Sequence, residues 1–200
     1  MIRGFWFWVI YCILRTGLFF YHPVFRVIGR EHVPKDGAYL ICANHISMSD
    51  PIWVVLGLGL RHIPRVLAKK EALSYFIIGD LMKKVGVIGI DREGNDVHAI
   101  KECIRALRND QQLLIFPEGT RNKPGMNVKP KRGAMLLAHR TQVPVLPVYV
   151  SVKRRPFGPV TCVIGEPYLP EFPDKRPTEQ QLETAVRDLM DRIYQMGEEV

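Results

Sequence analysis

The stretch "AYLICANHISMSDPIWVVLGLGL", residues 38–60, joins a short apolar run to a longer one through a polar turn. Residues 38–43 are apolar without alternation, which is typical of a strand buried on both faces of a sheet. Pro51 opens the second apolar stretch, and proline is favoured in the first turn of a helix. This order of strand, turn and helix predicts an α/β fold in which His45 lies just beyond the strand and Asp50 at the start of the helix.

The remaining chain repeats the same alternation. Further apolar, strand-like runs occupy residues 65–68, 86–90, 112–116, 143–150 and 160–165. Helical spacing occupies residues 71–85, 95–110, 132–141 and 178–196, and Thr178 caps the last of these helices. Short strands that are apolar on both faces and alternate with helices predict a mixed, mostly parallel sheet covered by helices. In such sheets functional residues collect where the strands end.

The composition favours an anionic partner. Lys and Arg number 28 against 20 Asp and Glu, which gives a formal charge of +8. This excess suits nucleic acid, anionic lipid headgroups or phosphorylated substrates. The four cysteines (Cys12, Cys42, Cys103 and Cys162) lie far apart and lack metal-ligand spacing. We therefore expect no metal site, and buried free thiols in a reducing compartment, which favours the cytoplasmic side.

Residues 1–25 are the most apolar and aromatic part of the chain, and we predict them to be an N-terminal membrane-associated segment. Only residues 4–14 separate Arg3 from Arg15, and a helix of this length covers about 16 Å of a hydrocarbon core of about 30 Å. A helix extended to Tyr21 is long enough, but it places Arg15 in the apolar zone. The sequence favours a shallow or re-entrant anchor over a full span, with residues 26–200 on the cytoplasmic face.

Two interpretations of His45 and Asp50 follow from their positions. In one, Asp50 caps the helix and His45 is an exposed loop residue. In the other, the Asp50 carboxylate binds one imidazole nitrogen and leaves the second nitrogen free to accept a proton. Ser47 and Ser49 share the same turn, so neither is an obvious covalent nucleophile. A catalytic His45 would therefore act as a general base on a substrate hydroxyl.

Three further polar clusters follow predicted strands. In "FPEGTR", 116–121, Arg121 can bind a phosphate with its planar fork while Glu118 accepts a hydrogen bond from a polyol hydroxyl, although an ordinary turn with a surface ion pair fits the same residues. Arg92 follows the strand of "GVIGIDR", 86–92, and basic residues follow the strand in "AKKE", 68–71. Solvated charges are the alternative for both. Together the clusters suit an acceptor that carries a phosphate and a free hydroxyl.

Four short motifs follow one another in the chain, namely NHxxxxD at 44–50, IDR at 90–92, FPEGTR at 116–121 and VPVLPV at 143–148. In this order they resemble the glycerophospholipid acyltransferase family, most closely its bacterial 1-acyl-sn-glycerol-3-phosphate acyltransferases. The lead-in at 28–45 and "AKKEAL" at 68–73 resemble that family as well. The resemblance covers residues 26–166 and implies a glycerol-3-phosphate acyltransferase-like fold, with an acyltransferase domain at 26–200.

The resemblance also implies a role for each matching residue. His45 would deprotonate the free hydroxyl of 1-acyl-sn-glycerol 3-phosphate, a lysophospholipid, and Asp50 would orient His45. The hydroxyl would attack acyl-CoA or acyl carrier protein directly, forming phosphatidic acid. The residues implied in acceptor binding are Glu118, Gly119 and Thr120, together with Arg121, Lys69 and Arg92 for the phosphate. Residues 145–148 would line the acyl side, and neither a metal nor a cofactor is implied.

Some positions depart from the family pattern. "EAL" at 71–73 replaces a tighter "EL", which leaves the choice between Lys69 and Lys70 open, and Gly89 stands where relatives carry a bulkier residue. The alternatives are an acyltransferase for another lysophospholipid or phosphate-bearing alcohol, and a non-catalytic basic protein that binds anionic membrane. We do not expect nucleic-acid binding, because the chain carries no recognition motif for it.

Overall fold

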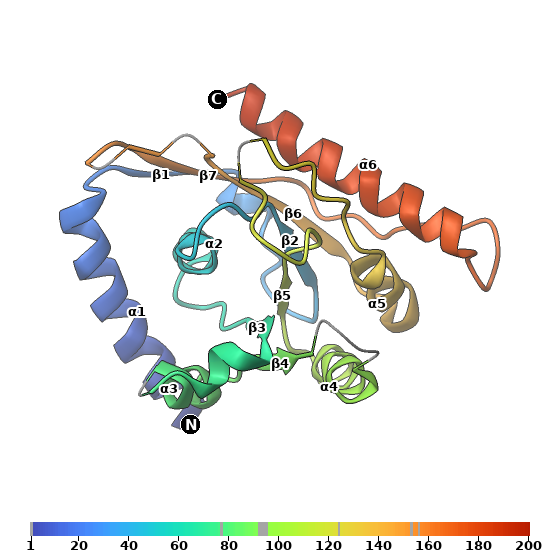
Figure 1. Cartoon of the computed structure of the whole chain (residues 1–200), viewed down its shortest axis with the longest axis horizontal. Coiled ribbons are helices and arrows are strands. Elements are labelled where there is room, and N and C mark those ends of the chain that lie inside the picture. Colours follow the sequence, from blue (N-terminus) through green and yellow to red (C-terminus); the bar gives the residue numbers. More distant parts are fainter. Residues whose placement is uncertain (1, 77, 92–95, 124, 153, 156) are drawn as a thin grey trace.

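The computed structural model describes the whole chain except residues 1, 77, 92–95, 124, 153 and 156. Its described strands form one sheet of order β1-β7-β6-β2-β5-β3-β4, which can be followed from the upper left of Figure 1 to its lower part. The strands are β1 (Phe25–Ile28), β2 (Leu40–Ala43), β3 (Arg65–Lys69), β4 (Ile88–Ile90), β5 (Leu113–Ile115), β6 (Val145–Val150) and β7 (Val160–Ile164).

Most neighbouring strands run in the same direction. β6, β2, β5, β3 and β4 are parallel to one another, whereas β7 is antiparallel to β6 and parallel to β1. The prediction of a mixed, mostly parallel sheet is confirmed. Because the five parallel strands point the same way, the residues that follow them meet at one edge of the sheet.

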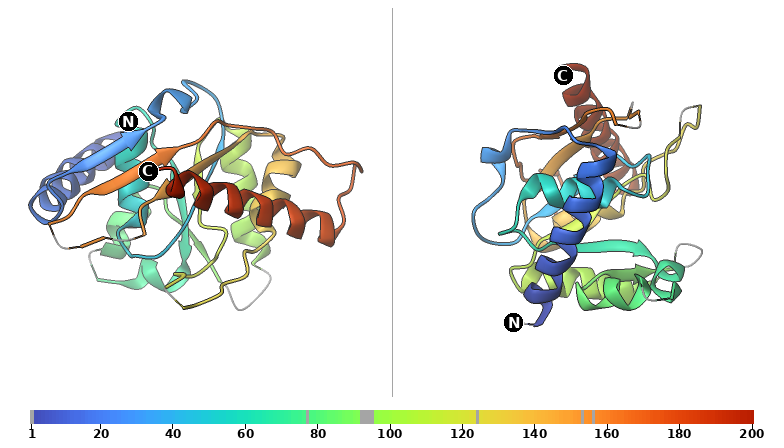
Figure 2. Two further views of the ribbon diagram at one scale, coloured as in Figure 1. Left: turned by 90° about the horizontal axis from the view of Figure 1, so that it is seen from above. Right: turned by 90° about the vertical axis from the view of Figure 1, so that its left-hand side faces the viewer.

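Helices cover both faces of this sheet. The α-helices are α1 (Ile2–Tyr21), α2 (Asp50–Leu58), α3 (Ile78–Lys84), α4 (Val97–Arg108), α5 (Gly133–Thr141) and α6 (Glu179–Glu198), with 3₁₀ turns η1 (Arg30–His32) and η2 (Lys70–Ser74). α4, α5 and α6 cover one face and α2 the other, while α1 lies along the outside of the molecule (Figure 2). The predicted cap of α6 is confirmed, because the Thr178 side chain accepts a hydrogen bond from the Gln181 N–H.

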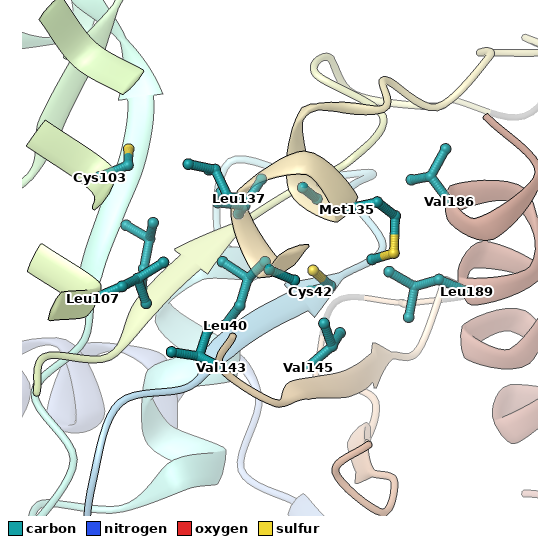
Figure 3. Packing of buried hydrophobic residues seen from close by; sticks show 14 of the residues in the cluster. Leu40, Cys42, Cys103, Leu107, Met135, Leu137, Val143, Val145, Val186 and Leu189 are labelled. Carbon is teal, nitrogen blue, oxygen red and sulfur yellow. The ribbon is translucent and has the colours of Figure 1, made fainter. Parts of the chain in front are cut away.

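The alternation of side chains along β2 explains why its sequence is apolar throughout. Leu40 and Cys42 enter the core beneath α4, α5 and α6, part of which is drawn in Figure 3. Ile41 and Ala43 enter the second core, beneath α2. All four residues are fully buried, so β2 is a central strand that holds the following turn in place.

The expected continuous helix over 71–85 is wrong. η2 ends at Ser74, the backbone becomes extended at Tyr75, and α3 starts only at Ile78. A close backbone approach accompanies the break, because a Cβ atom added to Gly79 would lie 2.1 Å from the Leu73 carbonyl oxygen. The same turn explains Gly89, where an added Cβ atom would lie 2.7 Å from Leu73 Cδ1.

The N-terminal segment is one unbroken helix. Its residues Gly4–Tyr21 are long and apolar enough to cross a membrane by length and composition, a test that signal sequences and core helices also pass. Only 11% of this stretch is buried, and Phe7 and Tyr11 anchor it to the core beneath α2. The choice between a shallow anchor and a span stays a prediction.

All four cysteines are free thiols, as expected. Cys42, Cys103 and Cys162 are buried, whereas Cys12 in α1 is half-buried. Burial raises the pKa of the Cys103 and Cys162 thiols to about 12, so neither supplies a thiolate nucleophile at neutral pH.

Candidate active site

The site lies where the parallel strands end. His45 follows β2, the turn 116–122 follows β5, Lys69 ends β3, and the loop beginning at Ser151 follows β6. The strands are neighbours in the order β6-β2-β5-β3, so these segments lie beside one another along one edge. The topology therefore brings together clusters that are far apart in the sequence.

Asn44 connects the end of β2 to the end of β6. Its side chain is fully buried, its Nδ2 donates to the Val150 carbonyl oxygen at 2.9 Å, and its Oδ1 accepts from the Val150 N–H at 2.8 Å. A buried amide that satisfies both backbone groups of its partner holds the two strand ends rigidly together. Asn44 thereby fixes the backbone that leads directly into His45.

His45 and Asp50 form a hydrogen-bonded pair. His45 Nδ1 lies 2.9 Å from Asp50 Oδ2, and the imidazole stacks on the Phe116 ring with the centroids 4.3 Å apart. An ionised carboxylate only accepts hydrogen bonds, so we assign the proton of the neutral imidazole to Nδ1. The lone pair of Nε2 is then free to accept a proton. The His45 side chain is 14% exposed, which leaves the ring reachable from the edge of the sheet.

The Asp50 carboxylate organises the turn before it. Its Oδ2 also accepts the N–H groups of Ile46 at 2.6 Å and Ser47 at 2.7 Å. The interpretation of Asp50 as the helix cap is wrong, because Asp50 is the first residue of α2 and Ser49 occupies the cap position. The carboxylate faces back toward His45 because the turn 45–47 wraps around it.

Asp50 is ionised despite complete burial. Burial alone would raise the pKa of this carboxyl, but the hydrogen bond from His45 and the charge of Arg154 outweigh that effect and lower it. At neutral pH the carboxylate can therefore both hold the Nδ1 proton and stabilise an imidazolium ion.

Arg154, on the loop after β6, is a site residue that sequence analysis missed. Its guanidinium donates to Asp50 Oδ1, to Ser49 Oγ at 3.2 Å and to the Ser151 carbonyl oxygen at 2.7 Å. The side chain is only 9% exposed. Its position in "VKRRP" could have identified Arg154 as a candidate, because these basic residues directly follow a predicted strand, as the other polar clusters do.

Glu118 supports His45 from the neighbouring strand end. Its carboxylate accepts the His45 N–H at 2.6 Å, Asn122 Nδ2 at 2.9 Å and the Tyr194 hydroxyl at 2.7 Å. The Asn122 N–H in turn donates to the His45 carbonyl oxygen at 2.7 Å. With an exposed fraction of 2%, Glu118 is not part of a surface ion pair. Its predicted contact with an acceptor hydroxyl stays a prediction.

Tyr194, on α6, is the second residue that sequence analysis missed. Burial and the hydrogen bond to Glu118 raise the pKa of its hydroxyl, which therefore stays protonated and donates. The helical spacing of 178–196 identifies the buried side of α6, but it contains no indication that a tyrosine there reaches the site.

The rest of the FPEGTR turn lies closer to solvent. Gly119 has a φ of 67°, in the left-handed region that favours glycine, and the Lys131 side chain packs over it. Thr120 and Arg121 are both exposed. The turn thus presents the Arg121 guanidinium at the surface beside the buried Glu118.

Of the residues predicted to bind a phosphate, the structure describes Lys69 and Arg121. Lys69 ends β3 at the same edge, with a side chain that is 46% exposed and Nζ 3.5 Å from Glu71 Oε1. Arg92 lies outside the described residues. The binding of a phosphate by Lys69, Arg92 and Arg121 stays a prediction.

The serine hydroxyls nearby have other partners. Ser47 Oγ lies 3.1 Å from Ser49 Oγ, which in turn accepts from Arg154. Among the described residues, no serine or cysteine is hydrogen-bonded to the His45 ring. That His45 acts on a hydroxyl from outside the chain stays a prediction.

Comparison with known proteins agrees with this geometry. A family model described as "Acyltransferase" matches residues 24–151. The chain is 29% identical to a 1-acyl-sn-glycerol-3-phosphate acyltransferase of Bacillus subtilis over 176 residues, covering 86% of this chain and 87% of that protein. It is 36% identical to the human 1-acyl-sn-glycerol-3-phosphate acyltransferase alpha over 129 residues, but this match covers 63% of the chain and 45% of the human protein.

A solved structure shares the fold. The crystal structure of the 1-acyl-sn-glycerophosphate acyltransferase PlsC from Thermotoga maritima superposes with a TM-score of 0.64 at 29% identity. The match covers 84% of this chain and 70% of that protein. The matched family residues, 24–151, include His45, Asp50 and the turn 116–122.

Proposed function

The chain belongs to the acyltransferase family, and from this premise we propose that it transfers an acyl group from a thioester to the free hydroxyl of 1-acyl-sn-glycerol 3-phosphate, forming phosphatidic acid. One observation carries the chemistry. His45 Nδ1 donates a hydrogen bond to the buried, ionised Asp50, and Nε2 stays free at the strand edge that also carries the cations. This is the arrangement of a general base for an incoming hydroxyl.

The reaction needs one proton transfer and one acyl transfer. His45 Nε2 removes the proton from the acceptor hydroxyl as its oxygen attacks the thioester carbonyl carbon. The carbon–sulfur bond breaks, and the imidazolium returns the proton to the leaving thiolate. Asp50 stabilises the imidazolium between the two steps, and no acyl-enzyme intermediate forms.

Binding of the acceptor is divided between two parts of the edge. Arg121 and Lys69 are positively charged, exposed side chains at the same edge of the sheet. Charge-assisted hydrogen bonds to a phosphate would offset the conformational entropy that these side chains lose when they become ordered. Glu118 contributes by holding the His45 backbone, because its carboxylate already accepts hydrogen bonds from three protein donors. Arg121 therefore sets the position of the substrate, and Glu118 sets the position of the base.

The acceptor and its product are lipids, so the site must work at a membrane. The apolar helix α1 and the net charge of +8 support association with anionic membrane. The free, buried thiols support placement of the domain on the cytoplasmic face of the cell membrane. The donor, acyl-CoA or acyl carrier protein, would approach from the aqueous side.

Purified full-length protein in detergent micelles, given acyl-CoA and acyl carrier protein in parallel with a panel of acceptors, tests the proposal. We expect thioester-dependent acylation of 1-acyl-sn-glycerol 3-phosphate. The rate should fall by a factor of about 10²–10⁴ in His45→Ala, with an unchanged melting temperature. A control variant, His139→Ala on α5, removes a histidine of the opposite end of the fold and should keep the activity.

Other outcomes separate the alternatives. Preference for a different lysophospholipid or a phosphate-bearing alcohol would keep the mechanism and change the acceptor. Binding to anionic vesicles without turnover on any acceptor would replace the enzyme by a basic membrane-binding protein. An active His45→Ala variant would remove His45 from the mechanism.

A further inference from the structure

Arg154 is the cation in direct contact with the catalytic pair, and it reaches the pair from a different part of the chain. Its guanidinium bonds to Asp50 Oδ1, the carboxylate oxygen that His45 does not use. The side chains of Asp50 and Arg154 are 0% and 9% exposed, respectively. Such a contact is shielded from water, so its Coulombic attraction is screened less than that of an ion pair at the surface.

The backbone around Arg154 is anchored on both sides. Before it, the Ser151 N–H donates to the Thr161 carbonyl oxygen at 2.9 Å, which attaches the loop to β7. After it, the Phe157 N–H donates to the Tyr21 carbonyl oxygen at 2.9 Å, which attaches the loop to the end of α1 (Figure 1). The guanidinium also bonds to its own loop, through the Ser151 carbonyl oxygen. Contacts with β7, α1, the loop itself and Asp50 therefore hold this segment and its guanidinium beside the site.

We propose that Arg154 is a positioning residue of the acyl-transfer reaction, which holds the Asp50 carboxylate in place and balances its charge so that His45 is unprotonated and ready to act as a base. Asp50 Oδ2 accepts hydrogen bonds from His45 Nδ1 and from two backbone N–H groups, and Asp50 Oδ1 accepts one from Arg154. With both oxygens engaged, the carboxylate cannot rotate away from the imidazole.

Charge balance follows from the same geometry. A buried carboxylate without a cation would bind the proton of the imidazolium strongly and keep His45 charged. The Arg154 guanidinium offsets this negative charge at a distance of one hydrogen bond. In the described part of the chain, the ionisable groups hydrogen-bonded next to the pair include Glu118, which accepts the His45 N–H, and through it Tyr194 of α6, which donates to Glu118. Arg154 thus offsets the charge of Asp50 while Glu118 acts on the backbone of His45.

The test measures proton uptake by the pair with and without Arg154. The full-length protein in detergent micelles carries ¹³C-labelled histidine, and loss of one of the six histidine signals in His45→Ala assigns His45. In Arg154→Gln we expect the titration midpoint of the His45 ring to rise by about one pH unit. In Arg154→Lys, which keeps a cation, the rise should be smaller.

The neighbouring arginine supplies a matched control. Arg155 is exposed in the same loop, and no hydrogen bond or ion pair of its side chain reaches the described residues of the site. Arg155→Gln removes the same charge and should leave the titration unchanged. In an Asp50→Asn background, Arg154→Gln should add little further shift, because Arg154 acts through Asp50. Arg154→Gln leaves the buried Asp50 carboxylate without its cation and could fail to fold. In that case the titration midpoint of His45 is measured in Arg154→Lys and in the double variant Asp50→Asn/Arg154→Gln, because neither contains an unpaired buried carboxylate.

The activity measurement rests on the proposed function. The acidic limb of kcat/KM for acyl transfer should move to higher pH in Arg154→Gln by the same amount as the titration, and activity should recover in part at alkaline pH. A merely structural residue would lower the rate equally at every pH. An unmoved midpoint in Arg154→Gln, or an equal shift in the Asp50→Asn background, would overturn the proposal. Absence of turnover in the wild type would refute the proposed function, while the titration would still decide the role of Arg154.

Discussion

The two halves of the site are built in opposite ways. Around His45, the carboxylates of Asp50 and Glu118 are 0% and 2% exposed, and all four of their oxygens accept hydrogen bonds from the chain. Around Arg121 and Lys69, the side chains reach into solvent. A base must be held in place before the reaction begins, whereas a cation that binds phosphate gains its strongest partner only with the substrate. The buried half should therefore control kcat, and the exposed half should control KM.

The largest effect is expected at Asp50. Asparagine keeps the size of the side chain but removes the charge that fixes the Nδ1–H tautomer and stabilises the imidazolium. We expect Asp50→Asn to lower kcat by a factor of about 10³–10⁴ with little change in KM, as measured with 1-acyl-sn-glycerol 3-phosphate. A rise in KM at unchanged kcat would instead place Asp50 in acceptor binding.

The same carboxylate predicts how stability depends on pH. The pKa of Asp50 is lower in the folded chain than its value of 3.8 in the unfolded chain. The ionised carboxylate therefore contributes fully to the free energy of unfolding above pH 3.8, and this contribution is lost as the pH falls through the folded pKa. Melting curves of the wild type should therefore show a loss of stability in acid that Asp50→Asn lacks. Parallel curves for both proteins from about pH 5 to about pH 2 would contradict the assignment of an ionised, stabilising Asp50.

The second largest effect is expected at Glu118. Glutamine keeps one acceptor oxygen, but its amide group faces at least one of the three donors, so at least one buried donor loses its acceptor. A buried donor without an acceptor costs about 1–3 kcal/mol. If this cost is relieved by displacement of His45, kcat should fall by roughly tenfold to hundredfold. Glu118→Gln should lower kcat, and Tyr194→Phe, which removes one donor and leaves the carboxylate, should lower it less. If Glu118→Gln instead raises KM with kcat unchanged, the predicted contact with an acceptor hydroxyl would be favoured.

The contrast between the two halves also explains what the sequence could predict. The strand 38–43 and the position of His45 follow from local patterns, because an apolar run and a proline specify a strand, a turn and a helix within about twenty residues. Arg154 and Tyr194 could not be found in this way, since their contacts with Asp50 and Glu118 span 104 and 76 residues. The break after η2 was missed for a related reason, because helical spacing does not reveal that Gly79 approaches the Leu73 backbone.

The third largest effect is expected at Arg121, in the exposed half. A hydrogen bond to a charged group contributes about 1.5–3 kcal/mol, so Arg121→Ala should raise KM for a phosphate-bearing acceptor by roughly tenfold or more. Initial rates at several acceptor concentrations check this, and the effect should weaken as salt is added. Arg108→Ala, at the far end of α4, removes the same charge and should leave KM unchanged. Equal effects of the two substitutions would indicate a general electrostatic attraction and no specific phosphate contact.

The smallest effect separates Lys69 from Lys70. Lys69 ends β3 at the site edge, and its ion pair with Glu71 is exposed, so the pair itself contributes at most about 1 kcal/mol. Lys70 is the first residue of η2. The backbone N–H groups of Asp91 and Ala99 lower the pKa of Asp96, and the charge of Lys70 adds to this effect. Lys70 therefore lies near Asp96, which occupies the cap position of α4.

Single substitutions of the two lysines decide between them. Lys69→Ala should raise KM for the acceptor by a few-fold, about the change expected of a partly screened cation, while Lys70→Ala should leave it unchanged. Steady-state kinetics at low salt should show the difference in KM between the two variants most clearly, because added salt screens the interactions of exposed charges. The reverse result would assign the phosphate to η2, and the edge formed by β2, β5 and β3 would then hold the base but only part of the acceptor site.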